Sequence, residues 1–279
     1  MADLKYATGT FTSSDDTDIY YQSWTPTPSR ALLVVAHGIG EHGGRYGHVI
    51  DAVAPLGLAV WALDHRGHGR SGGKRGHMMA FSEFIEDLRA FVELAKTREP
   101  GKKAFLLGHS LGGLIALTYA LTYPETIAAV VASAPALKLA IAVPRLKAAI
   151  GNKLSDLWPS LTLANELDAA LLSHDSHEVK LYQEDPLVHN RISTRFFTEF
   201  VKQMDYTRSH AANLTIPCLL QQGGDDRLVH PDGARAFFEG LAVADRKLLW
   251  YDGFYHEIYN EIQRDRPLKD LADWLAPRV

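Results

Sequence analysis

The sequence has little of what several classes of protein require. It contains one cysteine, Cys218, in 279 residues, which excludes an internal disulfide framework and favours a reducing compartment. No run reaches the roughly 18 apolar residues of a membrane-spanning helix, and the first residues lack the apolar segment of a secretion signal. Acidic residues outnumber basic ones, 33 to 29, which leaves a formal charge of −4. We therefore predict a cytoplasmic protein with no nucleic-acid partner.

Metal-binding motifs are also missing. His65, His68 and His77 lie close to Asp64 in the sequence, but there is no His-Glu-x-x-His motif and no repeated cysteine spacing. We predict that the protein holds no metal. The loop is instead expected to pack beneath a site, with His65 and Arg66 held by local hydrogen bonds.

Apolar runs alternate with helical patterns along most of the chain. Apolar residues make up 46% of the sequence, enough for one large core with a modest insertion. The runs predict strands at 6–12, 19–24, 31–36, 58–63, 104–107, 127–132, 216–221 and 247–251, and helices at 47–56, 81–98, after residue 110 and at 257–275. Such alternation predicts an α/β fold, with a mostly parallel sheet, helices on both faces and a site at the carboxyl ends of the strands.

One short motif lies at the junction of a predicted strand and a predicted helix. Gly108-His109-Ser110-Leu111-Gly112 has the form Gly-x-Ser-x-Gly and lies between a strand-like run and a helix-like run that ends at Pro124. A strand, a sharp turn and a helix in this order hold a serine on a strained elbow, with helix N–H groups directed at it. The motif alone also suits a glycine-rich connection with a spare serine. The catalytic interpretation therefore needs a base and an acid elsewhere in the chain.

A suitable acid and base follow in the sequence. A serine hydroxyl is a poor nucleophile until a histidine removes its proton, and a carboxylate must orient that histidine. Asp226 follows the predicted strand 216–221, and His256 follows the strand 247–251. Ser110, Asp226 and His256 thus each fall in a loop after a strand, in the chain order of open α/β hydrolases.

Both partners also have a plainer interpretation. Asp225 or Asp226 would cap the helix that begins near Pro231, because Asp is a preferred N-cap residue. His256 is one of 13 histidines, and most histidines are solvated or packed rather than catalytic. The position of His256 after the last strand favours the catalytic interpretation.

Nearly the whole chain resembles a known family. The matching residues are 37–46 (HGIGEHGGRY), 64–72 (DHRGHGRSG), 108–113 (GHSLGG), Asp226-Arg227 and Tyr255-His256. They are similar to the monoacylglycerol lipase and lysophospholipase branch of the α/β-hydrolase family. The resemblance implies that Ser110 is the nucleophile, His256 the general base and acid, and Asp226 the orienting carboxylate. It also implies an oxyanion hole from the backbone N–H groups of Ile39 and Leu111, which would stabilise the tetrahedral intermediate.

The same resemblance implies a substrate and its contacts. Glu41 and Arg45 stand where the family gathers contacts to the alcohol portion, and Tyr182 resembles a cap tyrosine of similar role. Tyr259 stands where lipases of the mammalian type carry a histidine, so the alcohol preference stays open. The implied activity is that of a serine carboxylesterase, which hydrolyses small amphiphilic lipid esters, above all monoacylglycerols, without a cofactor.

Other reactions on the same residues remain open. Lysophospholipase, general carboxylesterase, thioesterase, peptidase and cofactor-free haloperoxidase variants all occur in the family. A peptidase would need an acid in the inserted segment to hold the substrate's amine, and Glu166, Glu178 and Glu184 are candidates. A non-catalytic binding scaffold is disfavoured because all three catalytic residues are present.

The alternation stops between Pro135 and Thr215, where helical segments replace strands. A structureless loop of that length is uncommon in a compact domain. We predict a core of residues 1–135 and 216–279, with a helical cap of residues 136–215 inserted over the active edge. The cap has many apolar residues: Leu137, Leu139, Ile141, Val143, Leu146, Ile150, Leu154, Leu157, Trp158, Leu161 and Leu163. They would pack on the core, line an acyl-chain channel, or make transient contact with a membrane.

A different class of protein is the remaining alternative. The pattern Gly-x-Gly-x-x-Gly occurs at Gly38, Gly40 and Gly43. It follows the predicted strand 31–36, and Asp64 comes about 20 residues later, as in an oxidoreductase that binds a nicotinamide dinucleotide. Gly44 and Gly47 would weaken the helix that must follow, each by about 1 kcal/mol. This interpretation also leaves the serine, aspartate and histidine unexplained, so the hydrolase is favoured.

Overall fold

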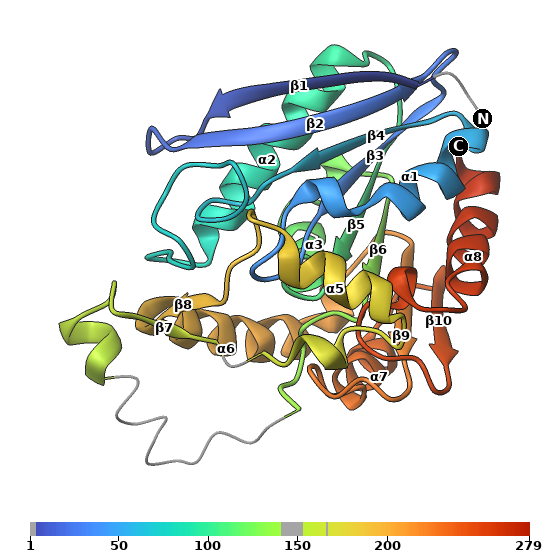
Figure 1. Cartoon of the computed structure of the whole chain (residues 1–279). Helices are drawn as coiled ribbons and strands as arrows, with labels where there is room; N and C mark the ends of the chain where they lie inside the picture. The colour runs from blue at the N-terminus through green and yellow to red at the C-terminus, as the bar shows by residue number, and fades with distance from the viewer. Residues whose placement is uncertain (1–3, 141–152, 166) are drawn as a thin grey trace.

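A computed structural model describes residues 4–140, 153–165 and 167–279. An eight-stranded sheet forms the centre of the molecule (Figure 1). Its strands are β1 (Leu4–Thr12), β2 (Asp18–Pro26), β3 (Ala31–Ala36), β4 (Leu58–Leu63), β5 (Ala104–His109), β6 (Ala129–Ser133), β9 (Cys218–Gly223) and β10 (Arg246–Tyr251). The order is β1-β2-β4-β3-β5-β6-β9-β10. Strands β1 and β2 are antiparallel to their neighbours, and the others run parallel. The predicted α/β class and its mostly parallel sheet are confirmed.

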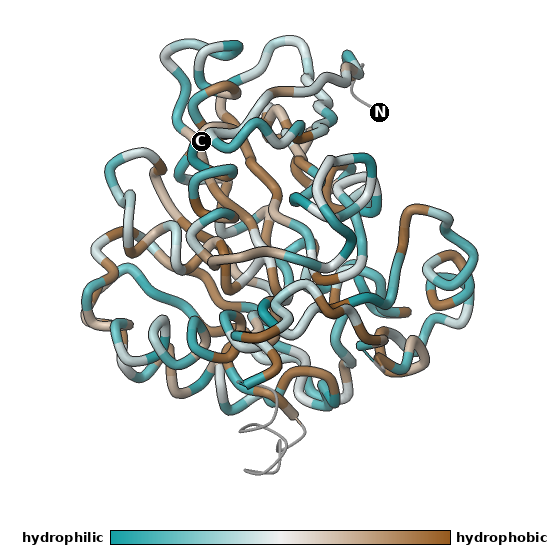
Figure 2. The backbone as a smooth tube through the Cα atoms, turned by 90° about the vertical axis from the view of Figure 1, so that its left-hand side faces the viewer, coloured by the Kyte–Doolittle hydropathy of each residue, from teal (hydrophilic) through white to brown (hydrophobic). Residues whose placement is uncertain are grey.

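Helices cover both faces of this sheet. They are α1 (Gly47–Val53), α2 (Ser82–Arg98), α3 (Leu111–Thr122), α6 (Thr194–Ser209), α7 (Asp232–Gly240) and α8 (Asp265–Leu275), while α5 (Ser176–Glu184) lies in the inserted segment. Every residue of β3, β4 and β5 is buried, as expected for parallel strands packed on two sides. Alternate residues of these strands join two separate apolar clusters, one with α1 and α8 and the other with α2, α3, α6 and α7. Figure 2 shows the hydrophobic strands inside and hydrophilic segments outside.

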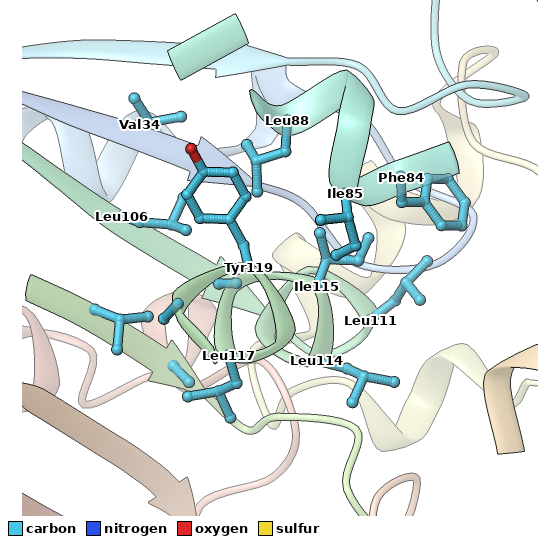
Figure 3. Close-up of a cluster of buried hydrophobic side chains, with 14 of the residues drawn as sticks. Val34, Phe84, Ile85, Leu88, Leu106, Leu111, Leu114, Ile115, Leu117 and Tyr119 are labelled. Atoms are coloured by element: carbon cyan, nitrogen blue, oxygen red, sulfur yellow. The ribbon is translucent and has the colours of Figure 1, made fainter. Parts of the chain in front are cut away.

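Helix α3, which directly follows Ser110, packs against α2 and the sheet. Figure 3 shows Val34 and Leu106 of the sheet beside Leu88 of α2 and Ile115 and Tyr119 of α3. All of these side chains are buried. Every residue of α3 from Leu111 to Ala120 is buried, so packing fixes the position of the helix at the end of β5.

The inserted segment differs from the predicted all-helical cap. It contains α5 and α6, but also a two-stranded antiparallel sheet of β7 (Thr162–Ala164) and β8 (Arg191–Ser193). These strands are three residues long, too short for a period-2 pattern to show in the sequence. Helix α6 packs Phe196, Phe200 and Met204 into the core cluster. The apolar positions Ile141, Val143, Leu146 and Ile150 lie outside the described residues.

The C-terminal helix is shorter than predicted. A continuous helix over 257–275 was expected, but the chain forms a short turn at Ile258–Asn260 and α8 begins only at Asp265. Glu261 explains the interruption. Its buried carboxylate accepts hydrogen bonds from the Tyr255 N–H (2.8 Å) and pairs with His174 Nδ1 of the cap (2.9 Å). This tertiary contact holds the segment away from a helical path.

Short 3-10 turns connect several of these elements. They are Gly43–Arg45, Ala54–Leu56, Pro124–Thr126, Ala169–Leu171, Ala211–Asn213, Ile258–Asn260 and Ala276–Arg278. Across residues 4–140, 153–165 and 167–279, no helix combines the length and hydrophobicity that crossing a bilayer requires. The cytoplasmic location stays a prediction.

Candidate active site

Ser110 lies on a sharp turn between β5 and α3. Its backbone has φ 53° and ψ −116°, a conformation that costs a non-glycine residue about 1–3 kcal/mol. Its N–H donates to Ser133 O (3.0 Å), and its carbonyl accepts from the N–H groups of Leu114 (3.1 Å) and Ala136 (2.9 Å). These bonds hold the strained turn, which places Ser110 at the carboxyl edge of the sheet.

The glycines on either side of Ser110 are required by close backbone approach. A Cβ on Gly108 would lie 2.0 Å from the carbonyl oxygen of Gly112, and a Cβ on Gly112 would lie 2.0 Å from that of Ala36. No larger residue fits either position without moving the strand or the helix. The strand, turn and helix predicted from the motif are therefore present, for steric reasons that the motif encodes.

Asp226 and His256 meet at the ends of β9 and β10. His256 Nδ1 lies 2.7 Å from Asp226 Oδ2, and Asp226 Oδ1 accepts from the N–H groups of Leu228 and Val229, both at 2.9 Å. Both side chains are buried. Asp226 does not cap α7, which begins without a side-chain cap, so the plainer interpretation of this acid is wrong. Because Nδ1 of His256 bonds to the acid, Nε2 is the ring nitrogen that the acid does not engage.

The buried pair shifts the proton affinities of both groups. Burial alone would lower the pKa of His256, but the charge and hydrogen bond of Asp226 outweigh it, so this pKa is raised above its ordinary value. Burial alone would raise the pKa of Asp226, but His256 and the two backbone N–H groups hold it below its ordinary value. Asp226 is therefore ionised, and its charge favours the protonated form of His256.

A large apolar cavity opens at Ser110 and His256. Its volume is about 480 Å³, and residues of the cap and of the loop after β9 line most of it. Among these are Leu139, Leu154, Leu163, Ile192, Phe200 and Leu228. Part of the apolar cap thus lines a cavity at Ser110, which is where the predicted acyl-chain channel would have to lie. The cavity has the size of a small-molecule site.

A buried ionic cluster lies on the other side of Ser110. Arg45 donates to Glu41 Oε2 (2.7 Å) and to both oxygens of Glu257 (2.7 and 2.9 Å). Glu41 Oε1 also accepts from the Gly38 N–H (2.6 Å) and the Tyr46 hydroxyl (2.9 Å). One cation against two carboxylates, 1 − 2, gives the cluster a net charge of −1. Its members connect the loop after β3 with the loop after β10.

A second cavity, called the polar cavity after the side chains of Glu41, Tyr182 and Glu257 in its wall, lies between this cluster and Ser110. It has a volume of only about 10 Å³, and Glu41, Tyr182 and Glu257 line it together with Ser110 and His256. The structure therefore brings two of the three predicted substrate-binding residues, Glu41 and Tyr182, to the serine. The third, Arg45, lies behind the carboxylates, with its guanidinium 4.8 Å from the centre of the Tyr182 ring.

The predicted oxyanion donors lie on both sides of Ser110. Ile39 lines the apolar and the polar cavity, and Leu111 is the first residue of α3. The first N–H groups of a helix have no acceptor within it, so the Leu111 N–H can serve an outside oxygen. His37 Nδ1 donates to the Gly38 carbonyl (2.7 Å), which belongs to the same peptide as the Ile39 N–H and so fixes its orientation. The geometry is compatible with an oxyanion hole at these two residues.

The glycine pattern after β3 does not form a dinucleotide site. The carboxylate of Glu41 accepts from the Gly38 N–H, where a pyrophosphate would have to bind. Helix α1 begins only at Gly47, so no helix N-terminus follows the third glycine. Asp64 accepts from the N–H groups of Gly43 and Arg70, both at 2.8 Å, and is not free for a ribose.

The histidine-rich loop after β4 agrees only in part with the prediction. Arg66 is held as expected, by pairs with Asp87 (2.6 Å), Asp15 and Glu83 (both 2.7 Å). His65 is not: its backbone N–H donates to a ring nitrogen of His37 (2.8 Å), but neither of its own ring nitrogens has a partner among the described residues. Burial lowers the pKa of His65 to about 3, so the ring is neutral and packs as an aromatic group.

Comparison with known families agrees with this arrangement of fold and site. The model of the family described as "Serine aminopeptidase, S33" matches residues 27–263, which is most of the chain. The chain belongs to this family. The matched range includes Ser110, Asp226 and His256.

Individual relatives indicate to which branch of the family the chain belongs. The chain is 39% identical over 263 residues to the monoacylglycerol lipase of Mycolicibacterium smegmatis, with 94% of each chain covered. It is 34% identical to the monoglyceride lipase of Homo sapiens, over 96% of this chain and 89% of that one. The crystal structure of the monoacylglycerol lipase of Paleococcus ferrophilus is 36% identical and superposes with a TM-score of 0.83, over 99% and 100% of the two chains. The α/β-hydrolase fold, the monoacylglycerol lipase-like branch and a serine ester hydrolase are thereby confirmed.

Two residues at the site received no role from the sequence. The sequence pattern places Glu257 at the start of a helix, although its position directly after His256 indicates that it lies near the site. His109 was read only as part of the serine motif, yet its ring lies 4.8 Å from that of His256. Tyr259, by contrast, donates its hydroxyl to Gln221 and lines neither cavity at the serine.

The acids considered for a peptidase are not at the nucleophile. Glu178 pairs with His48 at 3.0 Å, Glu184 is exposed beside Lys180, and neither lines a cavity with Ser110. Glu166 lies outside the described residues. In the part of the chain that the structure describes, these acids give no support to a peptidase.

Proposed function

We propose that this hydrolase cleaves monoacylglycerols and similar small lipid esters through an acyl-enzyme on Ser110. The observation that carries the proposal is the two-sided site. An apolar cavity of about 480 Å³ and a small polar cavity meet at Ser110 and His256. An amphiphilic ester has the same two parts, an apolar acyl chain and a polar alcohol. Lysophospholipids and simple carboxyl esters are the alternative substrates of the same site.

Each step of the reaction has a residue to perform it. His256 Nε2 takes the proton of Ser110 as the hydroxyl oxygen attacks the ester carbonyl, and Asp226 stabilises the imidazolium. The N–H groups of Ile39 and Leu111 donate to the negative oxygen of the tetrahedral intermediate. His256 then returns its proton to the departing alcohol, and water attacks the acyl-enzyme by the same sequence.

A substrate panel tests the proposal, and a variant that fills part of the apolar cavity tests whether the acyl chain binds there. Wild-type enzyme should hydrolyse monoacylglycerols better than lysophospholipids, p-nitrophenyl esters or amino-acid amides. Ile192→Trp should lower kcat/KM for a long-chain monoacylglycerol by about tenfold or more and leave a butyryl ester within about twofold, because the ring occupies space for the distal methylenes.

A surface variant controls for the new tryptophan. Ile262 is 67% exposed and lines no cavity at the serine, so Ile262→Trp should change neither substrate. Equal losses on long and short esters in Ile192→Trp would show that the acyl chain does not bind in this cavity. A preference for amino-acid amides would replace the lipase by a peptidase.

We also propose that the cap makes transient contact with a membrane. Leu157 and Trp158 are 85% and 60% exposed, and Leu163, exposed as well, lines the apolar cavity. A lipid surface in contact with these side chains would face the entrance used by the acyl chain. The double variant Leu157→Asp, Trp158→Asp should reduce cosedimentation with phosphatidylcholine vesicles while a soluble butyryl ester is still hydrolysed. Unchanged vesicle binding would refute the contact.

A further inference from the structure

We propose that Glu257 makes the alcohol side of the site selective by charge, so that neutral and cationic alcohols are accepted as leaving groups and anionic ones are excluded. The inference rests on the proposed function, since it concerns the same ester substrates. It assigns a specificity role to a residue that does not belong to the triad. It also separates monoacylglycerols from lysophospholipids whose head group carries a net negative charge.

Glu257 is fixed at the polar cavity. It directly follows His256, and its backbone N–H donates to Leu172 O of the cap (2.8 Å). Its carboxylate accepts from Arg45 and from the amide of Asn260 (2.7 Å), and the residue lines the cavity that Ser110 and His256 share. Burial would raise its pKa, but the pair with Arg45 lowers it to about 2. The group is therefore a fixed negative charge next to the leaving alcohol.

The nearest cation cannot bind an anionic substrate. The guanidinium of Arg45 is engaged by Glu41 and by both oxygens of Glu257, and its side chain is only 9% exposed. The ring of Tyr182 covers its face. An anionic head group would have to displace a carboxylate that already makes two hydrogen bonds with Arg45.

The other titratable groups at the cavity do not reverse its sign. Burial, followed by the neighbouring His256, lowers the pKa of His109 to about 4, so that ring is neutral. Asp226 adds a further negative charge behind His256. The pair of His48 and Glu178 lines the outer groove on the far side of Arg45. The leaving alcohol thus faces a site with excess negative charge.

The small size of the cavity strengthens this effect. A volume of about 10 Å³ holds about one water molecule, so little solvent screens the carboxylates from a bound head group. Charges interact more strongly where water is excluded. One hydroxyl of the leaving alcohol can take the place of that water and donate a hydrogen bond to Glu41 or Glu257, whereas a phosphate or another anion at this point is repelled.

Three esters of one fatty acid test the inference on wild-type enzyme. The glycerol ester is neutral, the glycerate ester has the same size but carries a carboxylate, and the choline ester is cationic. We expect kcat/KM for the glycerate ester to be at least about tenfold below that for the glycerol ester. Equal rates on these two esters would overturn the inference without any variant.

The variant Glu257→Gln then assigns the effect to one residue. The substitution keeps the shape of the side chain and the ion pair of Arg45 with Glu41. It removes one of the two negative charges, so the net charge of the cluster becomes 1 − 1, or zero. The ratio of glycerate to glycerol ester should rise by about tenfold, and the ratio of choline to glycerol ester should fall. Glu184→Gln, at an exposed position of the cap, is the matched control and should change neither ratio.

The outcomes separate this inference from the proposed function. An unchanged glycerate-to-glycerol ratio in an active, folded Glu257→Gln enzyme would refute the role of Glu257 while the lipase activity stands. If wild type cleaves p-nitrophenyl esters but no glycerol ester, the proposed function fails instead. Charge selection is then measured by acyl transfer from the p-nitrophenyl ester to glycerol against glycerate, where equal transfer would refute it.

Discussion

Ser110→Ala is expected to lower kcat for ester hydrolysis by about 10⁵- to 10⁶-fold. The turn between β5 and α3 places this hydroxyl where two cavities meet, and without its oxygen no acyl-enzyme can form. The turn is held by backbone hydrogen bonds, so the variant should fold normally. Its melting temperature should stay close to that of the wild type, and steady-state assays on a monoacylglycerol measure the loss.

Ser155→Ala is the matched control for this substitution. Ser155 is also buried, and its hydroxyl bonds to Thr198 within the cap, far in sequence from the catalytic loops. Its activity should stay within about threefold of the wild type. A Ser110→Ala enzyme that retains more than about one hundredth of wild-type turnover would remove the serine from the mechanism.

Asp226→Asn is expected to lower kcat by about 10⁴-fold. The carboxylate accepts a hydrogen bond from the N–H at His256 Nδ1, at 2.7 Å. The amide of asparagine can instead donate to this nitrogen, which leaves the hydrogen of the ring on Nε2. The base would then present a hydrogen to Ser110 where it must accept one. Pre-steady-state assays should show slower acylation with little change in substrate binding.

The neighbouring acid provides the control. Asp225 is exposed, and Asp225→Asn should keep nearly full activity. The pair of variants decides which of the two consecutive acids acts on the histidine. A large loss in Asp225→Asn with an active Asp226→Asn would reverse the assignment.

The pH dependence follows from the same contact. The base acts only when neutral, so kcat/KM should rise with pH through the pKa of His256, which Asp226 raises above its ordinary value of 6.5. Removing the carboxylate removes the group that favours the protonated form. The residual activity of Asp226→Asn should therefore have its midpoint at lower pH than the wild type, as a pH profile of kcat/KM measures.

Local patterns predicted the strands of the core and the loops that carry Ser110, Asp226 and His256, because local chemistry determines both. Strands β3, β4 and β5 are buried on two sides, which requires continuous apolar runs. The glycines beside Ser110 are required by backbone contacts of 2.0 Å. The loops with Asp226 and His256 could be placed because parallel strands all end at the same edge.

What the sequence did not predict depends on contacts between distant residues. The interruption before α8 arises from a bond between Glu261 and His174 of the cap. Strands β7 and β8 form by pairing with each other, and β8 also bonds to Gly76 and packs Ile192 on the core. The role of Glu257 depends on Arg45, which lies 212 residues earlier. No local periodicity records such pairs, so they appear only once the chain is folded.

The central claim is that the reaction passes through a covalent bond to Ser110, and active-site labelling tests it most directly. The native enzyme is treated with a fluorophosphonate, which reacts with activated serines, and the modified peptide is identified by mass spectrometry. We predict one adduct, on Ser110, formed in step with the loss of hydrolysis and absent in Ser110→Ala. Full inactivation with the adduct on another residue, or ester hydrolysis that continues with Ser110 fully labelled, would contradict the account.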